Sequence, residues 1–289
     1  ILSNIIYSQI SEHKDYGGVV PEIAARSHIN NIDVVVQKSV KDAEINYNSV
    51  NAIAVTSGPG LKGGLLVGVT FAKTMASILE KPLIGINHLE GHALTIRMIQ
   101  KISFPYLLLL VTGGHTQLII VKGVGDYERL GTTIDDALGE AYDKTAKSLN
   151  LGYPGGPIIE KLAELGDGSA ISFPRPLYNS KEMNFSFSGL KTAVRQEIDS
   201  SLPINEKLRS NICAAFQDSV IDILENKLQM AVDYFKKNYS NDIDVVLAGG
   251  VASNKAILTS INSMSKKKNF NVHVSPKELC TDNAAMIAW

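Results

Sequence analysis

Two histidines four residues apart, in His88-Leu-Glu-Gly-His92, carry the clearest chemistry in this sequence. Side chains at positions i and i+4 share one face of a helix, so both imidazoles can reach a single metal ion. Glu90 lies between them and points to another side of the helix, which disfavours the His-Glu-x-x-His arrangement of zinc proteases. The spacing leaves two interpretations open, a metal site or two structural histidines.

A histidine pair needs a third ligand, and Asp282 in Cys280-Thr-Asp-Asn283 is the candidate. An oxygen donor beside two imidazoles leaves positions on the metal open for a substrate. An aspartate directly before an apolar run is also typical of a helix N-cap. The sequence alone does not decide between metal ligand and cap.

Two glycine pairs, Gly113-Gly114 and Gly249-Gly250, each follow an apolar run that predicts a buried strand. Backbone N–H groups in such turns can approach a phosphate closely, although ordinary turns use the same residues. The repeated strand–Gly-Gly pattern suits a duplicated, two-lobed nucleotide-binding fold. Asp143 can accept hydrogen bonds from both hydroxyls of a ribose, whereas Asn254 has two possible roles, contact with a base or ribose and capping of a helix.

Three further patterns are better explained without chemistry. Gly58-Pro-Gly-Leu-Lys-Gly63 matches Gly-x-Gly-x-x-Gly, but no acid ends the next strand, so we reject a dinucleotide site. Ser188-Gly-Leu-Lys191 lacks the companion motifs of Ser-x-x-Lys enzymes. Asp135 and Asp136 are expected in the first turn of a helix, where acids favour the helix dipole.

Composition limits the class of protein and its partners. Hydrophobic residues make up 45% of the 289 residues, which is typical of a globular protein, and no apolar run approaches the roughly 20 residues that span a bilayer. The net charge of −1 means that nucleic acid must meet a local basic patch. Lys236-Lys237 and Lys266-Lys267-Lys268 are the candidates, and solvated charge runs are the favoured explanation for both. Two distant cysteines fit a reducing compartment.

Strand-like runs alternate with longer helical patterns, which predicts an α/β fold. Residues 107–111 and 117–121 flank a glycine-containing turn and predict a β-hairpin. A boundary near 101–105 divides the chain into a first α/β lobe, residues 1–101, and a second, residues 102–275. Residues 276–289 are expected to return to the first lobe.

Nine short motifs follow one another along nearly the whole chain: Tyr16-Gly-Gly-Val-Val-Pro-Glu22, Ser57-Gly-Pro-Gly60, Asn87-His-Leu-Glu-Gly-His92, Thr112-Gly-Gly-His-Thr-Gln117, Asp135-Asp-Ala-Leu-Gly-Glu-Ala-Tyr-Asp-Lys-Thr-Ala146, Tyr153-Pro-Gly-Gly156, Phe185-Ser-Phe-Ser-Gly-Leu-Lys191, Ala248-Gly-Gly-Val251 and Cys280-Thr-Asp-Asn283. In order and spacing they resemble the tRNA adenosine threonylcarbamoyltransferase family, once labelled O-sialoglycoprotein endopeptidase. The bacterial or mitochondrial branch is closer than the archaeal one.

The resemblance implies an actin-like ATPase (ASKHA) fold, with two α/β lobes around a nucleotide cleft. It implies His88, His92 and Asp282 as metal ligands, in agreement with the spacing. The positions that it implies for nucleotide contact are Leu110, Val111, Thr112, Gly113, Gly114, Asp143, Gly156, Glu160 and Asn254. The sequence contains no convincing nucleophile, and Glu90 and His115 are the candidates for a catalytic general base.

The resemblance also implies the reaction, which is transfer of threonylcarbamoyl from threonylcarbamoyl-adenylate to the exocyclic amine of the adenosine beside a tRNA anticodon, with release of AMP. One divalent metal ion per subunit is expected, and two imidazoles with a carboxylate suit iron(II) or zinc about equally well. The implied partners are tRNA and either a paralogue of related fold with a small ATPase or a second copy in a homodimer. No membrane partner is expected, and the implied location is cytoplasmic, or the mitochondrial matrix in a eukaryote.

Members of the family begin with a Gly-Ile-Glu-Thr-Ser-Cys-Asp-Glu-Thr block and continue past the position of Trp289, so we expect this chain to lack both ends. Three alternatives fit less well. A sugar or acyl kinase of the same fold has no use for the histidine pair, and a metalloprotease needs a differently placed glutamate. A non-catalytic nucleotide-binding scaffold of the same fold should lose the metal ligands, which this chain retains.

Overall fold

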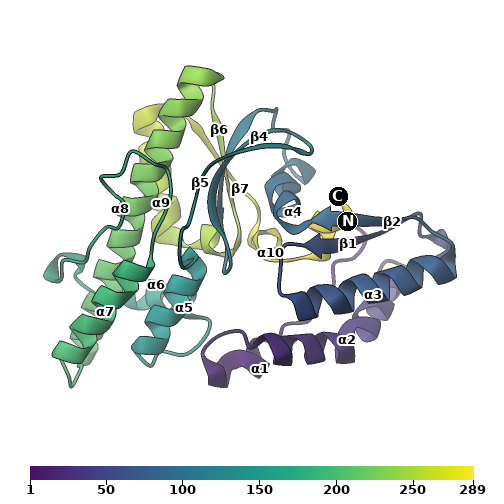
Figure 1. Ribbon diagram of the computed structural model, residues 1–289, viewed down its shortest axis with the longest axis horizontal. Helices are drawn as coiled ribbons and strands as arrows, with labels where there is room; N and C mark the ends of the chain where they lie inside the picture. The colour runs from purple at the N-terminus through teal and green to yellow at the C-terminus, as the bar shows by residue number, and fades with distance from the viewer. The chain divides into compact units, whose positions relative to one another are not determined.

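The computed structural model describes residues 1–289 and divides them into two compact units (Figure 1). Unit 1 comprises Ile1–Met98 and Asp282–Trp289, and unit 2 comprises Ile99–Thr281. The dividing points fall after residues 98 and 281, where the sequence placed them after residues 101 and 275. No helix in the structure is both long enough and apolar enough to cross a membrane.

Unit 1 is built on two parallel strands, β1 (Ile53–Gly58) and β2 (Leu83–Asn87), which pair from Ile53 and Leu83 onward. Helix α2 (Pro21–Asp42) packs on α3 (Lys62–Leu79), and α3 contacts strand β1. The shorter elements are α1 (Ile10–His13), α4 (His88–Leu94), α11 (Ala284–Ala288) and 3-10 turns at Lys14–Tyr16, Tyr47–Ser49 and Thr95–Met98.

Unit 2 contains a five-stranded mixed sheet in the order β5-β4-β3-β6-β7. Strand β3 (Tyr106–Val111) runs antiparallel to β4 (Thr116–Gly123) and parallel to β6 (Asp244–Ala248), so the predicted hairpin is confirmed. The remaining elements are β5 (Asp126–Thr132), β7 (Asn271–Val274), α5 (Leu138–Ser148), α6 (Gly155–Ala163), α7 (Ser188–Ser200), α8 (Glu206–Asn238), α9 (Lys255–Lys268), α10 (Lys277–Cys280) and 3-10 turns at Gly168–Ala170 and Gly250–Ser253.

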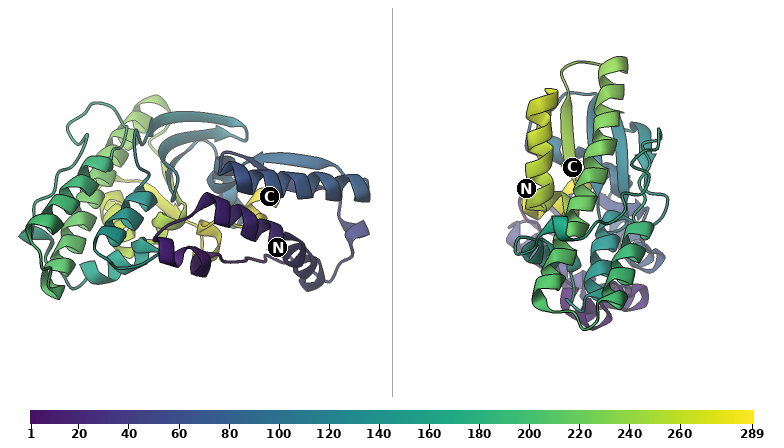
Figure 2. Two further views of the ribbon diagram at one scale, coloured as in Figure 1. Left: turned by 60° about the horizontal axis from the view of Figure 1, so that its bottom comes forward. Right: turned by 90° about the vertical axis from the view of Figure 1, so that its left-hand side faces the viewer.

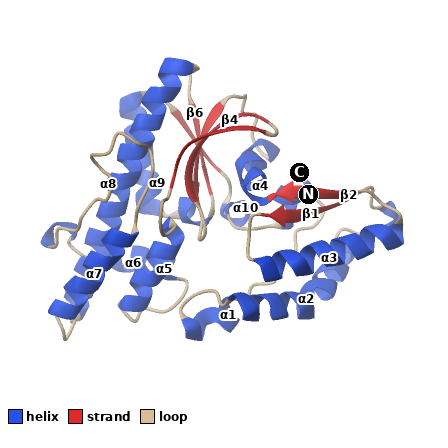
Figure 3. Ribbon diagram, viewed as in Figure 1, coloured by secondary structure: helices blue, strands red, loops and turns tan.

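The core of unit 2 forms around strand β3. Its sequence, Tyr-Leu-Leu-Leu-Leu-Val, is apolar throughout and all six residues are buried, as expected of a central strand covered on both faces. Leu107, Leu109 and Val111 alternate along the strand and pack into one large cluster with side chains from helices α5 to α9. Figure 3 shows α7, α8 and α9 together on one side of this sheet.

The order of the strands sets where the glycine pairs lie. Strands β3 and β6 are parallel neighbours, with Leu107 opposite Val245 and Leu110 opposite Ala248. Each strand is followed by one of the two glycine pairs, so both turns emerge at the same edge of the sheet. Ligands of α/β proteins bind at such carboxyl ends of parallel strands.

Candidate functional site

Helix α4 starts directly after strand β2 and carries both histidines on one face. Asn87 caps the helix, because its Oδ1 accepts the N–H groups of Leu89 at 2.9 Å and Glu90 at 3.3 Å. The ring centroids of His88 and His92 lie 4.9 Å apart. Their common face follows from the i, i+4 spacing on a continuous helix.

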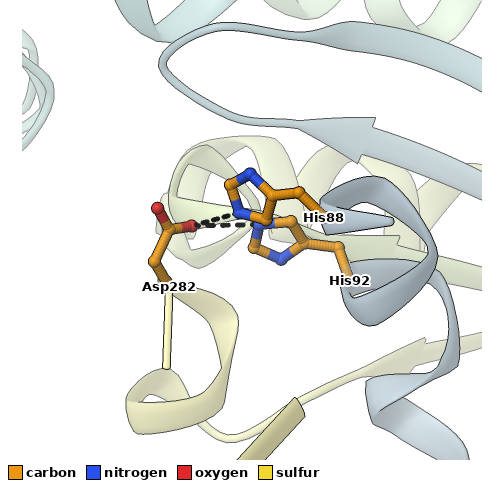
Figure 4. A group of neighbouring side chains, drawn as sticks. All are labelled: His88, His92 and Asp282. Carbon is orange, nitrogen blue, oxygen red and sulfur yellow. Dashed lines mark hydrogen bonds and ion pairs between the residues drawn. The ribbon is translucent and has the colours of Figure 1, made fainter. Parts of the chain in front are cut away.

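Asp282 points at both histidines (Figure 4). Its Oδ1 lies 3.1 Å from Nε2 of His88 and 3.1 Å from Nε2 of His92. Gly91, between the histidines, permits the approach of the segment that carries Asp282, because a Cβ there would lie 2.9 Å from Cδ1 of Ile287 in helix α11. The structure therefore brings together the three residues that the sequence grouped as metal ligands.

Asn283, and not Asp282, caps helix α11. Its Oδ1 accepts the N–H of Met286 at 3.0 Å. The alternative role that the sequence left open for Asp282 is thus filled by its neighbour, and the carboxylate of Asp282 faces the histidines instead.

His88 and Asp282 shift each other's pKa, and His92 contributes to the shift of Asp282. The hydrogen bond that His88 donates to Asp282 raises the pKa of this histidine against the lowering effect of partial burial, and the carbonyl of Pro59 adds to the rise. Desolvation raises the pKa of Asp282, but the hydrogen bonds from His88 and His92 lower it more. The pKa of this carboxyl therefore lies well below its usual range, and Asp282 is ionised at neutral pH.

This donor set fits a divalent transition metal. Its three candidate ligand atoms lie within 4.8 Å of one another, and metal–ligand bonds of about 2.0–2.2 Å place neighbouring ligand atoms about 3 Å apart. Nδ1 of His88 lies 3.3 Å from the carbonyl of Pro59, the kind of contact that orients a metal-bound imidazole. Side-chain exposure rises from 2% at His92 through 20% at His88 to 75% at Asp282, so the group opens to solvent on the side of the carboxylate.

The two candidate general bases lie outside this group. Glu90 belongs to helix α4 but is not among the three grouped ligand residues. His115 belongs to unit 2, in the turn after β3, where its backbone N–H donates to Oγ1 of Thr112 at 2.9 Å. Their role as bases stays a prediction.

In unit 2 the first glycine pair forms the turn between β3 and β4. Leu110 and Val111 end β3 with buried side chains, so their backbone alone can face a ligand. Thr112 holds the turn, since its Oγ1 accepts the N–H of Gly114 at 3.2 Å. A Cβ added at Gly113 or Gly114 would meet nothing within 4 Å. The turn thus presents bare backbone to open space, as a phosphate site requires.

The second glycine pair lies directly against the first turn. Gly249 follows β6 with a φ of +96°, and a Cβ there would collide with the carbonyl of Val111. At the start of α5, a Cβ on Gly139 would lie 2.8 Å from Cα of Gly113. Glycine is needed at both positions because three backbone segments meet here at the carboxyl edge of the sheet.

Asp143, on helix α5, points at the start of helix α6. Its Oδ1 accepts the N–H of Gly155 at 2.7 Å. This bond caps the start of α6, because the N-cap residue, Pro154, makes no side-chain hydrogen bond to the helix. Burial raises the pKa of Asp143 despite this bond, and Glu140 adds to the rise. A Cβ added at Gly156 would meet nothing within 4 Å. Only Oδ1 of Asp143 takes part in the bond to Gly155, and contact of its second oxygen with a ligand stays a prediction.

Glu160 and Asn254 both cap helix α9. Oε1 of Glu160 accepts the N–H of Lys255 at 2.6 Å, and Oδ1 of Asn254 accepts the N–H of Ile257 at 3.0 Å. The buried amide of Asn254 also donates to Gln217 at 3.1 Å. Of the two roles that the sequence left open for Asn254, the structure shows the cap. Contact of either side chain with a nucleotide stays a prediction.

Comparison with known proteins places the chain in a family. The sequence profile of TsaD, tRNA N6-adenosine threonylcarbamoyltransferase, matches residues 1–289. The chain belongs to the TsaD family. The tRNA N6-adenosine threonylcarbamoyltransferase of Bartonella bacilliformis is 53% identical over 296 residues, which cover 100% of this chain and 81% of that protein. The enzyme of that name from Brucella suis is 52% identical over 291 residues, with the same coverage.

Solved structures agree with the fold expected for a TsaD-family chain. HypF of T.kodakarensis superposes with a TM-score of 0.61 at 15% identity, covering 86% of this chain and 41% of that one. A full-length HypF in the phosphate- and nucleotide-bound form gives a TM-score of 0.61 at 14% identity, covering 88% of this chain and 40% of that one. At this identity the likeness concerns the fold alone, which is that of the actin-like ATPases, as predicted from the sequence.

Asp135 and Asp136 do not lie in a helical turn, contrary to the expectation, because α5 starts later, at Leu138. Asp135 accepts a hydrogen bond from Oγ of Ser188 at 2.7 Å, and Asp136 pairs with Nζ of Lys191 at 2.7 Å. These contacts join two motifs of the TsaD family, the segment before α5 and the start of α7. The Ser188 and Lys191 side chains therefore have partners in Asp135 and Asp136, in agreement with the rejection of a Ser-x-x-Lys enzyme site.

Sequence reasoning missed two residues that orient the histidines of this TsaD-family chain. Pro59 supplies the carbonyl beside Nδ1 of His88, and Gly91 allows α11 to pack on α4. Gly91 carried a usable signal, because a glycine inside a helical motif commonly marks close packing. No sequence pattern links Pro59 to His88, since the contact is made through a backbone carbonyl.

Proposed function

We propose that this protein transfers the threonylcarbamoyl group of threonylcarbamoyl-adenylate to the N6 amine of an adenosine beside a tRNA anticodon, releasing AMP. The observation that carries this proposal is the match of residues 1–289 to the TsaD family. Geometry supports it in both units: two imidazoles converge on one carboxylate in unit 1, and glycine turns meet at the carboxyl edge of the sheet in unit 2.

The adenylate half of the substrate is assigned to unit 2. The Gly113-Gly114 backbone faces its phosphate, where the absence of side chains allows a close approach. The donor is the N–H of Gly113, because the N–H of Gly114 donates to Oγ1 of Thr112. The second oxygen of Asp143 accepts hydrogen bonds from the ribose hydroxyls, while its Oδ1 holds Gly155. Gly156 leaves room at the start of α6 for the nucleotide.

Glu160 and Asn254 act next to this position. Both side chains bind backbone N–H groups at the start of helix α9. Because Glu160 belongs to helix α6, its bond also fixes α6 against the start of α9. A base or ribose that approached the α6–α9 junction would meet the carboxylate of Glu160, and contact with the buried amide of Asn254 requires it to exchange its bond to Gln217.

His88, His92 and Asp282 are assigned as ligands of iron(II) or zinc, and such an ion supplies Lewis-acid polarisation of an acyl oxygen when bound. The chain itself prepares the site for a cation. Asp282 is ionised because its pKa is lowered, and the carbonyl of Pro59 holds the ring of His88 with Nε2 toward the carboxylate.

The transfer is written as direct attack. The N6 lone pair forms a bond to the carbamoyl carbon, the bond between that carbon and the phosphate oxygen breaks, and AMP leaves with the electron pair. A hydrogen bond from the backbone N–H of Gly113 stabilises the negative charge on the departing phosphate, since the N–H of Gly114 donates to Thr112. The amine loses one proton, and Glu90 and His115 remain the candidates to accept it.

We further propose that a second protein assists the reaction, either a paralogue of related fold with a small ATPase or a second copy of this chain. The net charge of −1 gives no general attraction for tRNA, so added surface from a partner would help to hold the substrate. The proposed place of action is where tRNA is modified, the cytoplasm or, in a eukaryote, the mitochondrial matrix.

The experiment combines purified protein, threonylcarbamoyl-adenylate and unmodified tRNA, followed by digestion to nucleosides and mass spectrometry. We expect threonylcarbamoyl-adenosine and AMP in equal amounts. AMP binding without modified tRNA, also with the partner proteins added, would instead support a nucleotide-binding scaffold. Cleavage of a test polypeptide at the His88–His92 site would support a metalloprotease.

A further inference from the structure

The fold brings the two lysine runs of the sequence together at one end of unit 2. Lys236 and Lys237 lie in the last turn of helix α8, and Lys266, Lys267 and Lys268 form the last turn of helix α9. The two helices contact each other, and Figure 2 shows them side by side. Nζ of Lys236 donates to the carbonyl of Lys268 at 2.6 Å, so the two C-terminal ends touch. We call these five residues the lysine patch.

The charge of the lysine patch is not neutralised by neighbouring acids. None of its five lysines forms an ion pair. Of the acids nearest in sequence, Asp233 accepts from Gln229 at 2.8 Å and Asp244 accepts from His273 at 2.8 Å, while Asp242 forms no ion pair with a lysine of the patch. Lys237 and the α9 lysines are exposed, so their ammonium groups are open to a ligand.

Helix ends account for only part of this charge. Each helix C-terminus carries a partial charge of roughly −0.5, so two ends offset about one of the five positive charges. Lys236 alone meets one of these ends directly, through the carbonyl of Lys268. The other four lysines exceed what the helix dipoles require.

We propose that the lysine patch binds the phosphate backbone of the acceptor tRNA. This inference rests on the proposed function, since it takes tRNA as the substrate. Helix α9 has 14 residues and starts beside the nucleotide position at Asn254, so the patch lies about 20 Å from that position along the helix. A nucleic-acid duplex carries a phosphate charge about every 1.7 Å of its axis, so tRNA extending from the modified adenosine still presents phosphates at this distance.

The surface chemistry favours RNA over a membrane. A helix that binds anionic lipid needs exposed apolar anchors beside its lysines. The exposed neighbours of the patch include the polar Asn238 and Asn269. The one exposed aromatic neighbour, Tyr239, is tied to the protein because its hydroxyl donates to Glu128 at 2.6 Å. Repeated exposed ammonium groups without a shaped pocket suit sequence-independent phosphate contacts.

The test replaces Lys266, Lys267 and Lys268 by Gln in one variant and leaves Lys236 intact, because Lys236 holds the end of α9. A second variant replaces the same three lysines by Arg. The matched control replaces Lys41, Lys181 and Lys207 by Gln, which removes the same charge from exposed positions elsewhere. Affinity for unmodified tRNA is measured by fluorescence anisotropy between about 50 and 200 mM salt, and single-turnover transfer is measured at saturating tRNA.

We expect the Gln variant to bind tRNA about tenfold more weakly. The slope of log affinity against log salt concentration should also be smaller in magnitude by about 2, because each phosphate contact contributes about 0.7–0.9 to that slope. The Arg variant and the control should bind like the unaltered protein, and the transfer rate at saturation should be unchanged in all of them. Equal affinity and slope in the Gln variant, or equal weakening in the control, would overturn the proposal. Absence of transfer by the unaltered protein would refute the proposed function separately, since tRNA binding is measured without the reaction.

Discussion

Unit 1 and unit 2 build their sites by different means. In unit 2 the central strand β3 is entirely buried, and the site at its end consists of backbone, with glycines wherever two segments meet closely. In unit 1 most of strand β2 is exposed, and helix α3 buries only Ala72 and Ala76. The site of unit 1 consists of three side chains from two distant parts of the sequence.

The comparison teaches which kind of change each site tolerates. A backbone site on a rigid core is sensitive to added volume where its segments meet, because Gly139 and Gly249 have no room for a Cβ. A side-chain site is sensitive to loss of a ligand, since no other group can replace it. The predictions below test this contrast from the largest expected effect to the smallest.

Replacement of His88 by Ala should remove the metal from unit 1 and reduce transfer by roughly a thousandfold, because several kcal/mol of transition-state stabilisation are lost with the ion. The side chain of His88 is more exposed than that of His92, so the change leaves less of a cavity than at His92. Metal content by mass spectrometry and single-turnover rates measure the effect. Glu90→Gln, on the same helix, is the control for metal content and should retain the ion.

Gly249→Ala should destabilise unit 2 by about 2–4 kcal/mol, because the new Cβ meets the carbonyl of Val111 at a positive φ. Urea unfolding gives the change in free energy. Gly250→Ala is the matched control, since its Cβ would meet only Cγ2 of Thr281 at 3.7 Å, an ordinary contact. Equal stability of the two variants would show that the close approach of the two turns is not as described.

Asp143→Asn should weaken AMP binding about tenfold, because an ionised acceptor makes stronger hydrogen bonds to ribose hydroxyls than an amide. The amide oxygen can still cap Gly155, so the fold is retained. The pKa of Asp143 is raised by burial, so AMP affinity of the unaltered protein should fall as pH drops through that raised pKa. Calorimetric titration with AMP at a series of pH values should show this fall for the unaltered protein and none for the variant. Identical pH profiles of the two proteins would exclude the ribose role.

Metal affinity should fall as the pH is lowered, beginning above the ordinary pKa of histidine, about 6.5. The pKa of His88 is raised by Asp282, and the imidazole must lose its proton before it binds a metal. The proton therefore competes with the metal at higher pH than at an isolated histidine. Metal retention during dialysis at a series of pH values measures this; retention that is constant down to pH values well below 6 would contradict it.

Sequence patterns predicted the buried parts of the fold better than the exposed ones. The runs at 107–111 and 117–121 were visible because their residues are apolar, whereas strand β5 (Asp126–Thr132) is half-exposed and charged, and it escaped notice. The histidine pair was readable because both ligands lie on one helix. Asp282 was ambiguous because capping and metal binding favour the same residue type, and the contact that decides between them lies 190 residues away in the sequence.

The nucleotide positions show the same limit. Gly113 and Gly114 carried a local signal, but the approach of Gly249 depends on the parallel pairing of β3 with β6, which is long-range. For Asn254, spacing allowed both a ligand contact and a cap, and the burial that favours the cap arises only in the folded chain.

The most direct test of the central claim is single-turnover transfer from preformed threonylcarbamoyl-adenylate to unmodified tRNA, with and without a metal chelator. We expect transfer that the chelator abolishes and that iron(II) or zinc restores, with no restoration in the His88→Ala variant. Undiminished transfer after complete removal of the metal would contradict the claim that His88, His92 and Asp282 form a catalytic metal site.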